Sequence, residues 1–374
     1  MREFKPSATN AVNAEMNRLR KAGARIYNFG SGDPAVPNHP AVLKEVEKAA
    51  SEQVSPYAPV GGLTVLREEA AQWMNRRYGS RYGIDHTVVT CGGKFALFAA
   101  LQVLLDPGEE VLFAAPYWPS YPDIVRLAGG VPKPIPVDEK THWKVTPEDL
   151  LRHAGEKTRV FLFNNGCNPT GALYSKEEIS SLLKAAHGAG LYVVSDEVYS
   201  ELVYDGAKYS SCASFPEYRS IAVIVESCSK NFAMAGYRVG FAFAEPGIIK
   251  NMIAVQSQAT TGTSFISQRA ATAALRHSNE ASALVREAMD RRRQLFFRTY
   301  NELFGTSFKP VASTLYFFVK IKGTCEEILK KEHVALVPGA AFGMEGYARF
   351  AFSESEEDIV EGLKAFKKSQ NLSH

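Results

Sequence analysis

The middle of the chain alternates short apolar runs with amphipathic stretches. The apolar runs are continuous rather than alternating, which is typical of strands buried on both faces. Six strands are predicted in this way, at 86–91, 110–115, 159–165, 191–196, 221–226 and 239–244. Helices are predicted between them, near 94–105, 118–128, 176–189 and 246–257. This alternation predicts an α/β domain of three layers (αβα), in which helices cover both faces of a mainly parallel sheet.

The C-terminal part has a different order of elements. A long helical pattern covers residues 280–304 and ends near Gly305, a residue type that commonly terminates helices. The elements predicted after it are a strand at 314–321, a helix at 324–332, a strand at 347–352 and a helix at 355–369. We expect a smaller α+β domain here, packed beside the N-terminal residues. The predicted division gives a large domain, 46–280, and a small domain, 1–45 and 281–374.

Composition and charge narrow the class of protein. The chain has 374 residues, of which 45% are hydrophobic and 22% charged, as in ordinary globular proteins. The net charge of +3 gives no reason to expect a nucleic acid or a membrane as a partner. No window has the length and apolarity of a transmembrane span or a signal peptide, so a cytoplasmic location is expected. The five cysteines are scattered without metal-ligand spacing, which predicts reduced thiols and no metal site.

Candidate chemistry begins where the strand 221–226 ends. Residues 227–230 read Ser-Cys-Ser-Lys, and Arg238 follows eight residues later. Open α/β sheets bind their ligands outside the carboxyl ends of the strands. Two hydroxyls and a guanidinium could hold a phosphate there and leave the Lys230 amine free for a Schiff base with an aldehyde cofactor. A lysine that snorkels from a strand end is the alternative, and the serines and Arg238 favour the functional interpretation.

Polar residues also follow two other predicted strands. Asp196 closes the strand 191–196 and could pair with a pyridine nitrogen, while Tyr199 could direct its hydroxyl at the same ring. Asn168, after the strand 159–165, could donate a hydrogen bond to a ring oxygen. Each has an ordinary alternative when taken singly: a helix N-cap or loop acid, a core tyrosine, and an Asn-Pro turn.

Three further positions suggest an anionic or aromatic ligand. In Gly92-Gly93-Lys94, backbone amides at a helix start could cradle a phosphate, and Lys94 lies where the helix dipole disfavours a cation. Trp118 could stack on a cofactor ring. Arg349, within the apolar run 347–352, needs an anionic partner if it is buried, and a substrate carboxylate would serve. The alternatives are a tight turn, a core tryptophan and an outward-facing arginine on an edge strand.

The order of these motifs resembles that of the class I, fold-type I pyridoxal-phosphate aminotransferases, and most closely their bacterial and archaeal aspartate aminotransferase branch. The resemblance covers essentially the whole chain. Its motifs are Lys5-Pro6-Ser7-Ala8-Thr9, Gly30-Ser31-Gly32-Asp33-Pro34, Tyr57-Ala58-Pro59-Val60-Gly61-Gly62 with Leu66-Arg67, Gly92-Gly93-Lys94, Pro116-Tyr117-Trp118, Asn168-Pro169-Thr170-Gly171, Ser195-Asp196-Glu197-Val198-Tyr199, Ser227-Cys228-Ser229-Lys230 with Arg238, Val337-Pro338-Gly339, and Arg349.

The resemblance implies a role for each matching residue toward pyridoxal 5'-phosphate. Lys230 would form the Schiff base, Asp196 would pair with the pyridine nitrogen, and Trp118 would stack on the ring. Asn168 and Tyr199 would address its phenolic oxygen. The phosphate would be held by the backbone of Gly93 and Lys94, by Ser227, Ser229 and Arg238, and by Tyr57 from the neighbouring subunit of a homodimer.

The resemblance also implies how the substrate is held. Arg349 would grip the α-carboxylate, helped by Asn168 and the Gly32 backbone. Lys94, Ser7 and Thr9 resemble the groups that recognise a distal carboxylate. The implied activity is a ping-pong amino transfer between small molecules, with aspartate as the expected donor and 2-oxoglutarate as the expected acceptor.

Several other activities remain open beside this one. An aromatic or prephenate aminotransferase and a β-C–S lyase share the fold. A sugar aminotransferase does too, but Arg349 and the Asn-Pro-Thr-Gly turn favour α-amino acids. A transcription regulator with an aminotransferase-like sensor domain would need a DNA-binding module, and none is expected because the resemblance begins within a few residues of Met1.

The chain departs from the family pattern in three places. Residues 164–167 read Asn-Asn-Gly-Cys where relatives usually have Asn-Ser-Pro and a polar residue. Residues 312–316, Ala-Ser-Thr-Leu-Tyr, replace a usual Gly-Ala-Phe-Tyr, and Asp33 stands where Glu is commoner. The 312–316 stretch lies near the substrate in relatives, so substrate preference is the property that it is expected to affect.

Overall fold

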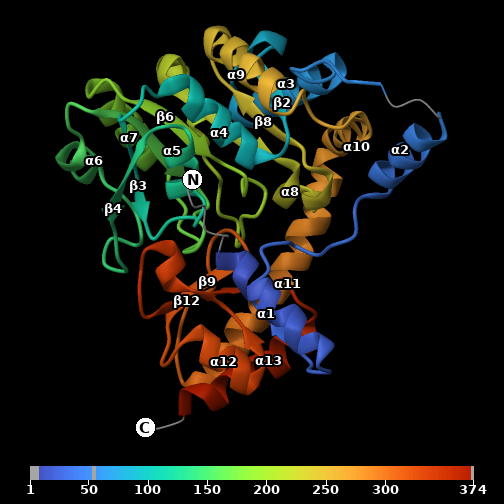
Figure 1. Cartoon of the computed structure of the whole chain (residues 1–374), viewed down its shortest axis with the longest axis vertical. Coiled ribbons are helices and arrows are strands. Elements are labelled where there is room, and N and C mark those ends of the chain that lie inside the picture. The colour runs from blue at the N-terminus through green and yellow to red at the C-terminus, as the bar shows by residue number, and fades with distance from the viewer. Residues whose placement is uncertain (1–7, 53–55, 372–374) are drawn as a thin grey trace, which may run out of the picture.

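A seven-stranded sheet forms the centre of the upper lobe in Figure 1, which shows the computed structural model; it describes residues 8–52 and 56–371. The strand order is β2-β8-β7-β6-β5-β3-β4. The strands are β2 (Thr87–Thr90), β3 (Glu110–Ala115), β4 (Val131–Pro136), β5 (Thr158–Asn164), β6 (Tyr192–Asp196), β7 (Ala222–Ser227) and β8 (Gly240–Phe243). Only β8 runs antiparallel to its neighbours, so the prediction of a mainly parallel sheet is confirmed.

The six predicted strands of this sheet all form, with ends within one residue of the prediction. The seventh, β4, was missed because its sequence, Val-Pro-Lys-Pro-Ile-Pro, carries three prolines. Proline has no N–H to donate and is therefore tolerated only at a sheet edge. β4 lies at such an edge and pairs only with β3.

Helices cover both faces of the sheet, which confirms the three-layer prediction. One face packs against α4 (Gly93–Leu104), α5 (Tyr121–Leu127) and α9 (Pro246–Ala259). The other packs against α3 (Thr64–Tyr78), α6 (Pro147–His153), α7 (Lys176–Gly188) and α10 (Phe265–Arg276). The starts of α6 and α7 are fixed by capping boxes, Thr146 with Asp149 and Ser175 with Glu178.

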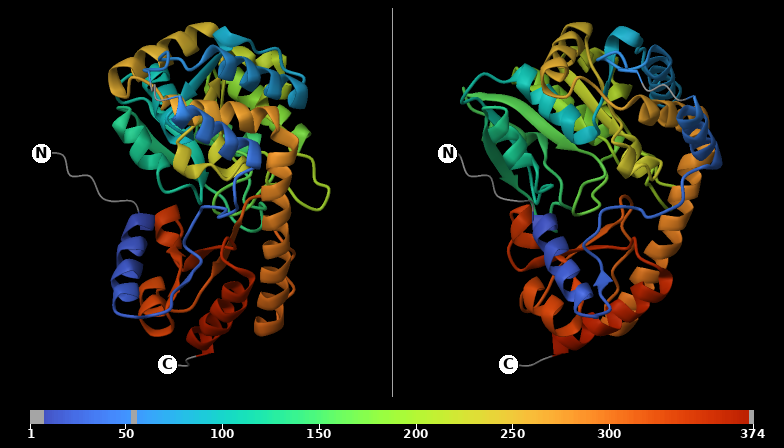
Figure 2. Two further views of the ribbon diagram at one scale, coloured as in Figure 1. Left: turned by 90° about the vertical axis from the view of Figure 1, so that its right-hand side faces the viewer. Right: turned by 45° about the vertical axis from the view of Figure 1, so that its right-hand side comes forward.

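The lower lobe is the predicted α+β part, built from both ends of the chain (Figures 1 and 2). Its elements are α1 (Ala8–Lys21), β1 (Tyr27–Asn28), β9 (Tyr316–Lys320), α12 (Cys325–Glu332), β10 (Val334–Ala335), β11 (Val337–Pro338), β12 (Tyr347–Ala351) and α13 (Glu356–Asn371). The strands β11-β12-β9 form an antiparallel sheet, and β1 pairs with β10. An aromatic core that includes Phe29, Phe296, Phe317 and Phe350 joins the N-terminal segment to the C-terminal elements.

One long helix, α11 (Ser278–Phe304), runs from the upper lobe into the lower one, as Figure 2 shows. The predicted division at 280/281 lies near its start. The division at 45/46 lies inside α2 (Pro40–Ser51), and α2 packs along α10 of the large lobe. We therefore propose that the large domain begins at Pro40. Within the described residues, no helix combines the length and apolar character needed to cross a membrane.

Candidate active site

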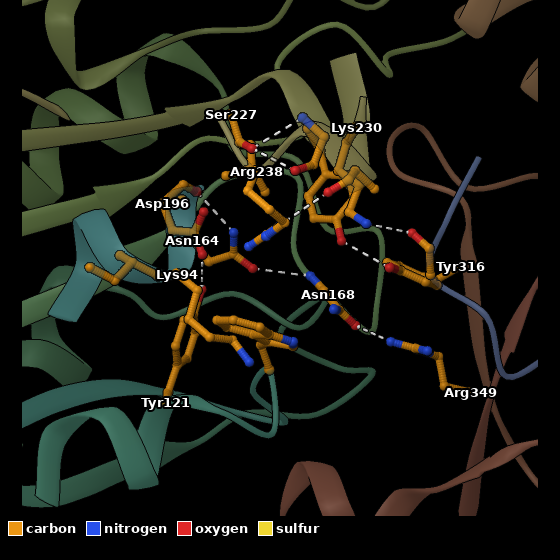
Figure 3. A pocket seen from close by; sticks show the side chains of 18 residues that line it. Lys94, Tyr121, Asn164, Asn168, Asp196, Ser227, Lys230, Arg238, Tyr316 and Arg349 are labelled. Atoms are coloured by element: carbon orange, nitrogen blue, oxygen red, sulfur yellow. Dashed lines mark hydrogen bonds between the residues drawn. The ribbon is translucent and has the colours of Figure 1, made fainter. Parts of the chain in front are cut away.

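A pocket of about 310 Å³ opens at the carboxyl ends of β5, β6 and β7, and residues of the lower lobe complete it (Figure 3). This location follows from the topology, because parallel strands bring their carboxyl ends to one edge of the sheet. Twelve residues singled out in the sequence line it: Gly32, Gly93, Lys94, Trp118, Asn168, Asp196, Tyr199, Ser227, Ser229, Lys230, Arg238 and Arg349.

The start of α4 forms one wall of the pocket and is built for an anion. The first N–H groups of a helix have no acceptor within the helix, and the dipole makes this end positive. Gly92 has a φ of 81°, and a Cβ there would lie 2.5 Å from Nη2 of Arg238, so the guanidinium lies directly against this turn. Glycine is also required at 240, where a Cβ would lie 2.4 Å from the backbone N of Gly93.

Two hydroxyls and two cations surround this helix end. The Ser227 hydroxyl accepts from the backbone N–H of Ser229, 3.1 Å away, and donates to the Ser229 hydroxyl at 2.9 Å. The protein around Lys94 desolvates its amine and lowers its pKa, and the positive charge of Arg238 adds to this effect. Such a concentration of positive charge and N–H groups suits a doubly charged phosphate.

Lys230 lies on the single-turn helix α8 (Cys228–Asn231), which Ser227 caps at the end of β7. Its half-buried side chain donates a hydrogen bond from Nζ to the carbonyl oxygen of Gly32, at 2.7 Å. A Cβ on Gly32 would lie 2.6 Å from the hydroxyl of Tyr316, so glycine lets this segment approach closely. Lys230 thus points into the pocket rather than snorkelling to the surface.

Asp196, the last residue of β6, is a buried carboxyl with one unused oxygen. It is 4% exposed, and its Oδ2 accepts a hydrogen bond of 2.6 Å from the hydroxyl of Tyr121. Its Oδ1 has no hydrogen-bond partner among the described residues. Burial raises the pKa of Asp196 to about 6, although the bond from Tyr121 opposes this rise. A protonated ring nitrogen at Oδ1 would supply the missing donor and favour the ionised carboxylate.

Asp196→Asn should change the pH dependence of stability of the cofactor-free protein. Between pH about 4 and 6 the folded state keeps a proton at Asp196 that the unfolded state has lost, so the free energy of unfolding falls as pH rises. Removing this titration should raise that free energy by roughly 1–3 kcal/mol at pH 8 and leave it almost unchanged at pH 4. Urea unfolding of both proteins at the two pH values measures this, and parallel pH profiles would contradict it.

Arg349 is buried in the lower lobe and has no carboxylate partner among the residues that the structure describes. It is 3% exposed and lies on β12, the central strand of its sheet, so the alternative of an outward-facing edge residue is wrong. Its Nη1 donates to Oδ1 of Asn168 at 3.1 Å and its Nη2 to the carbonyl of Gly30 at 2.9 Å, while Nε has no partner among the described residues. A desolvated guanidinium that is left with neutral partners favours an anionic ligand.

Three polar residues that line the pocket were not among the predicted site residues: Tyr121, Asn164 and Tyr316. Asn164 ends β5, donates from Nδ2 to the backbone oxygen of Asp196 at 2.9 Å, and accepts from the backbone N–H of Asn168 at 3.0 Å. Tyr316 supports two other site residues, because its ring lies 4.2 Å from the Arg349 guanidinium carbon and its hydroxyl is 2.9 Å from that of Tyr199. Asn164 and Tyr316 belong to the stretches 164–167 and 312–316, which depart from the family pattern. That departure was the feature of the sequence that could have pointed to them.

Trp118 lies in the loop before α5 and not in the core. It is half-buried in the pocket wall, with Nζ of Lys94 4.8 Å from its ring centroid and the ring of Tyr121 packed edge-on at 5.5 Å. Because Trp118 lines the pocket, its indole can contact a ligand that binds there.

The roles predicted for three further residues are not tested by the pocket of this single chain. Tyr57 is 93% exposed and does not line it. Thr9 lies on α1, and Ser7 lies outside the described residues. Their predicted roles remain predictions.

The sequence is similar to known proteins over nearly its whole length. The family described as aminotransferase class I and II matches residues 24–366. An aspartate aminotransferase from Streptomyces avermitilis is 36% identical, covering 97% of this chain and 93% of the relative. An aspartate/prephenate aminotransferase from Thermus thermophilus is 35% identical, covering 98% and 96%.

The fold agrees as well. The structure of the aspartate aminotransferase from Thermus thermophilus with maleate superposes with a TM-score of 0.92 at 34% identity, over 98% of this chain and all of that one. An aspartate aminotransferase from Thermotoga maritima superposes with a TM-score of 0.93 at 30% identity, over 98% of both chains. A family match over most of the sequence and full-length relatives of the same fold lead to one conclusion: this chain belongs to the class I and II aminotransferases.

Proposed function

We propose that this aminotransferase uses pyridoxal 5'-phosphate to transfer the amino group of L-aspartate to 2-oxoglutarate. The observation that carries the proposal is a pairing within one pocket. The lysine amine of Lys230 lies opposite a buried arginine, Arg349, that has no carboxylate partner among the described residues. An amine for carbonyl chemistry beside a carboxylate receptor is what α-amino acid transamination requires.

The residues present fit the cofactor. The start of α4, Ser227, Ser229 and Arg238 would hold its phosphate, and Asp196 would face its pyridine nitrogen. Trp118 would cover one face of the ring. When bound, the cofactor supplies an aldehyde and a ring that withdraws electrons from the substrate α-carbon.

The protein's own groups then position the substrate and move the proton. Arg349 would hold the α-carboxylate by a forked pair of hydrogen bonds. Oδ1 of Asn168 accepts from Arg349, which leaves Nδ2 free to donate to the ring oxygen. Burial raises the pKa of Tyr199 well above its ordinary value, so its hydroxyl stays protonated and can donate to the same oxygen. Nζ of Lys230, once free, would take the proton from the α-carbon and return it in the reverse half-reaction.

We also propose that two copies of the chain form a homodimer and that the protein is cytoplasmic. Tyr57 is a large aromatic residue that is almost fully exposed on the single chain, and in a homodimer its hydroxyl would reach the phosphate of the partner. The five cysteines are all free thiols, and four of them are buried, as expected for a reducing compartment.

Lys94→Met should separate aspartate from amino acids with short side chains. If the Lys94 ammonium binds the distal carboxylate, its loss removes a charge-assisted hydrogen bond worth about 1.5–3 kcal/mol. The kcat/KM for aspartate should then fall about 10–100-fold, and the value for alanine should change much less. Lys94→Arg, which keeps the charge, is the control. Equal losses for both amino acids would assign the Lys94 side chain to the cofactor instead.

A substrate panel tests the proposed function directly. Aspartate, prephenate, phenylalanine and cystathionine should be compared with 2-oxoglutarate or glutamate as the second substrate. Relatives named aspartate/prephenate aminotransferase support prephenate as a second substrate. We therefore expect activity with aspartate and with prephenate. Activity only with phenylalanine, or release of a thiol from cystathionine, would overturn the aspartate assignment.

A further inference from the structure

Two histidines stand where the chain crosses between the lobes. The first crossing runs from the lower lobe through residues 30–39 into α2, and His39 is the N-cap residue of α2. The second runs from α10 into α11, and His277 is the single residue between these helices. Because α2 packs along α10, the two crossings are neighbours. The imidazole rings stack with centroids 5.1 Å apart and an angle of 22° between their planes.

A carboxylate completes a set of metal ligands at this point. Glu280 follows on the first turn of α11, and its Oε2 lies 3.0 Å from Nδ1 of His277. One nitrogen from each imidazole and one carboxylate oxygen lie within 4.8 Å of one another, and no other such group of three occurs among the described residues. Two imidazoles and a carboxylate are the ligand set of many zinc sites.

The site can close around an ion at small cost. Tetrahedral Zn²⁺ with ligands at 2.0–2.1 Å needs ligand atoms about 3.3 Å apart. His277 and Glu280 are exposed and His39 is half-buried, so the side chains are free to make this adjustment. The hydrogen bond that His39 accepts from the backbone N–H of Ala41 is 3.3 Å long and therefore weak. The second carboxylate oxygen of Glu280 offers a further ligand atom for the ion.

We propose that His39, His277 and Glu280 bind one divalent transition-metal ion, with Zn²⁺ as the best match, and that the ion fastens the start of α2 to the start of α11. This site is separate from the active-site pocket. The segment that ends at His39 carries Gly32, which accepts the hydrogen bond of Lys230, and Asn38, whose Nδ2 donates to the carbonyls of Phe232 and Ala233. A metal here therefore restrains the segment that borders the pocket and the helix that carries the lower lobe.

Titration of the cofactor-loaded protein with ZnCl₂ by calorimetry tests this site. One ion per chain should bind saturably. His39→Asn retains an oxygen acceptor for the helix cap and removes only the imidazole. His39→Asn, His277→Ala and Glu280→Gln should each weaken binding at least about tenfold, as expected on loss of a ligand. His187→Ala, which removes an exposed histidine on α7, should bind as the wild type does.

Two further measurements separate this site from other metal-binding groups. Co²⁺ bound by imidazole and carboxylate shows only weak visible bands, whereas a thiolate ligand adds an intense near-ultraviolet band. At a Zn²⁺ concentration that saturates the wild type, the Tm of the wild type should rise and that of His39→Asn should rise less, because stabilisation by a ligand grows with its affinity for the folded state. Unaltered affinity in the three ligand variants, a thiolate band, or an absence of saturable binding would each overturn the proposal.

Discussion

Lys230→Ala should lower kcat for amino transfer by about 10⁴-fold or more while the protein stays folded. General acid–base catalysis alone contributes roughly 10²–10⁴-fold, and this amine would also form the covalent link to the cofactor. The other amine that lines the pocket, that of Lys94, lies beside Trp118 at the start of α4, while Nζ of Lys230 is bonded to Gly32 on the opposite side. No nearby group in the described pocket can therefore replace it.

The covalent role can be measured apart from activity. Borohydride reduction followed by mass spectrometry should leave the cofactor on the peptide that contains residue 230 in the wild type. Lys94→Met, the control, should retain this label because it changes the other pocket lysine. Lys230→Ala should take up cofactor without a covalent mark. Labelling of another lysine in Lys230→Ala, or residual transfer near the wild-type rate, would contradict the role of Lys230.

The site residues at the strand ends could be predicted from the sequence, because the topology of a parallel sheet brings them together. Asp196 and Ser227 close β6 and β7, and Asn168 follows β5 by a short loop. Parallel strands bring such residues to one edge whatever their separation in sequence. The same rule predicts neither Tyr121 nor Tyr316, because their positions depend on side-chain packing across a loop and across the two lobes.

The contacts between the two lobes could not be predicted from the sequence. Arg349 was predicted to need an anionic partner if it is buried, but its burial and its bonds to Asn168 and Gly30 depend on how the lower lobe lies against the sheet. The pairing of His39 with His277 depends likewise on the packing of α2 along α10. The expectation of no metal site rested on cysteine spacing alone, so it did not consider the two histidines on which the proposed site depends.

The helix α3 was not predicted, and the reason lies in its own sequence. In α3 the buried residues Leu66, Ala70, Trp73 and Met74 recur at helical spacing, so the periodic signal was present. This signal is weakened because the apolar Val65 is exposed and the charged Arg67 is half-buried, which is the reverse of an amphipathic pattern. The edge strand β4 was hidden by its prolines, whose tolerance there depends on having a neighbour on one side only.

Arg349→Ala should raise KM for every amino acid and 2-oxo acid by about 100-fold. Truncating one partner of a buried, hydrogen-bonded charge pair costs about 2–5 kcal/mol, and a hundredfold change corresponds to about 2.7 kcal/mol. The α-carboxylate is common to all these substrates, so aspartate and alanine should lose equally. This distinguishes Arg349 from Lys94, whose loss should affect aspartate more. Initial rates with both amino acids, in the wild type and the two variants, measure the difference.

Two matched variants show which property of Arg349 matters. Arg349→Lys keeps the charge but cannot form a forked pair of hydrogen bonds, so its KM should fall between those of the wild type and Arg349→Ala. Tyr316→Phe keeps the ring that lies 4.2 Å from the guanidinium and removes only the hydroxyl, so it should bind substrate carboxylates almost as the wild type does. If Arg349→Ala weakened aspartate alone, the guanidinium would bind the distal carboxylate, and another group would have to hold the α-carboxylate.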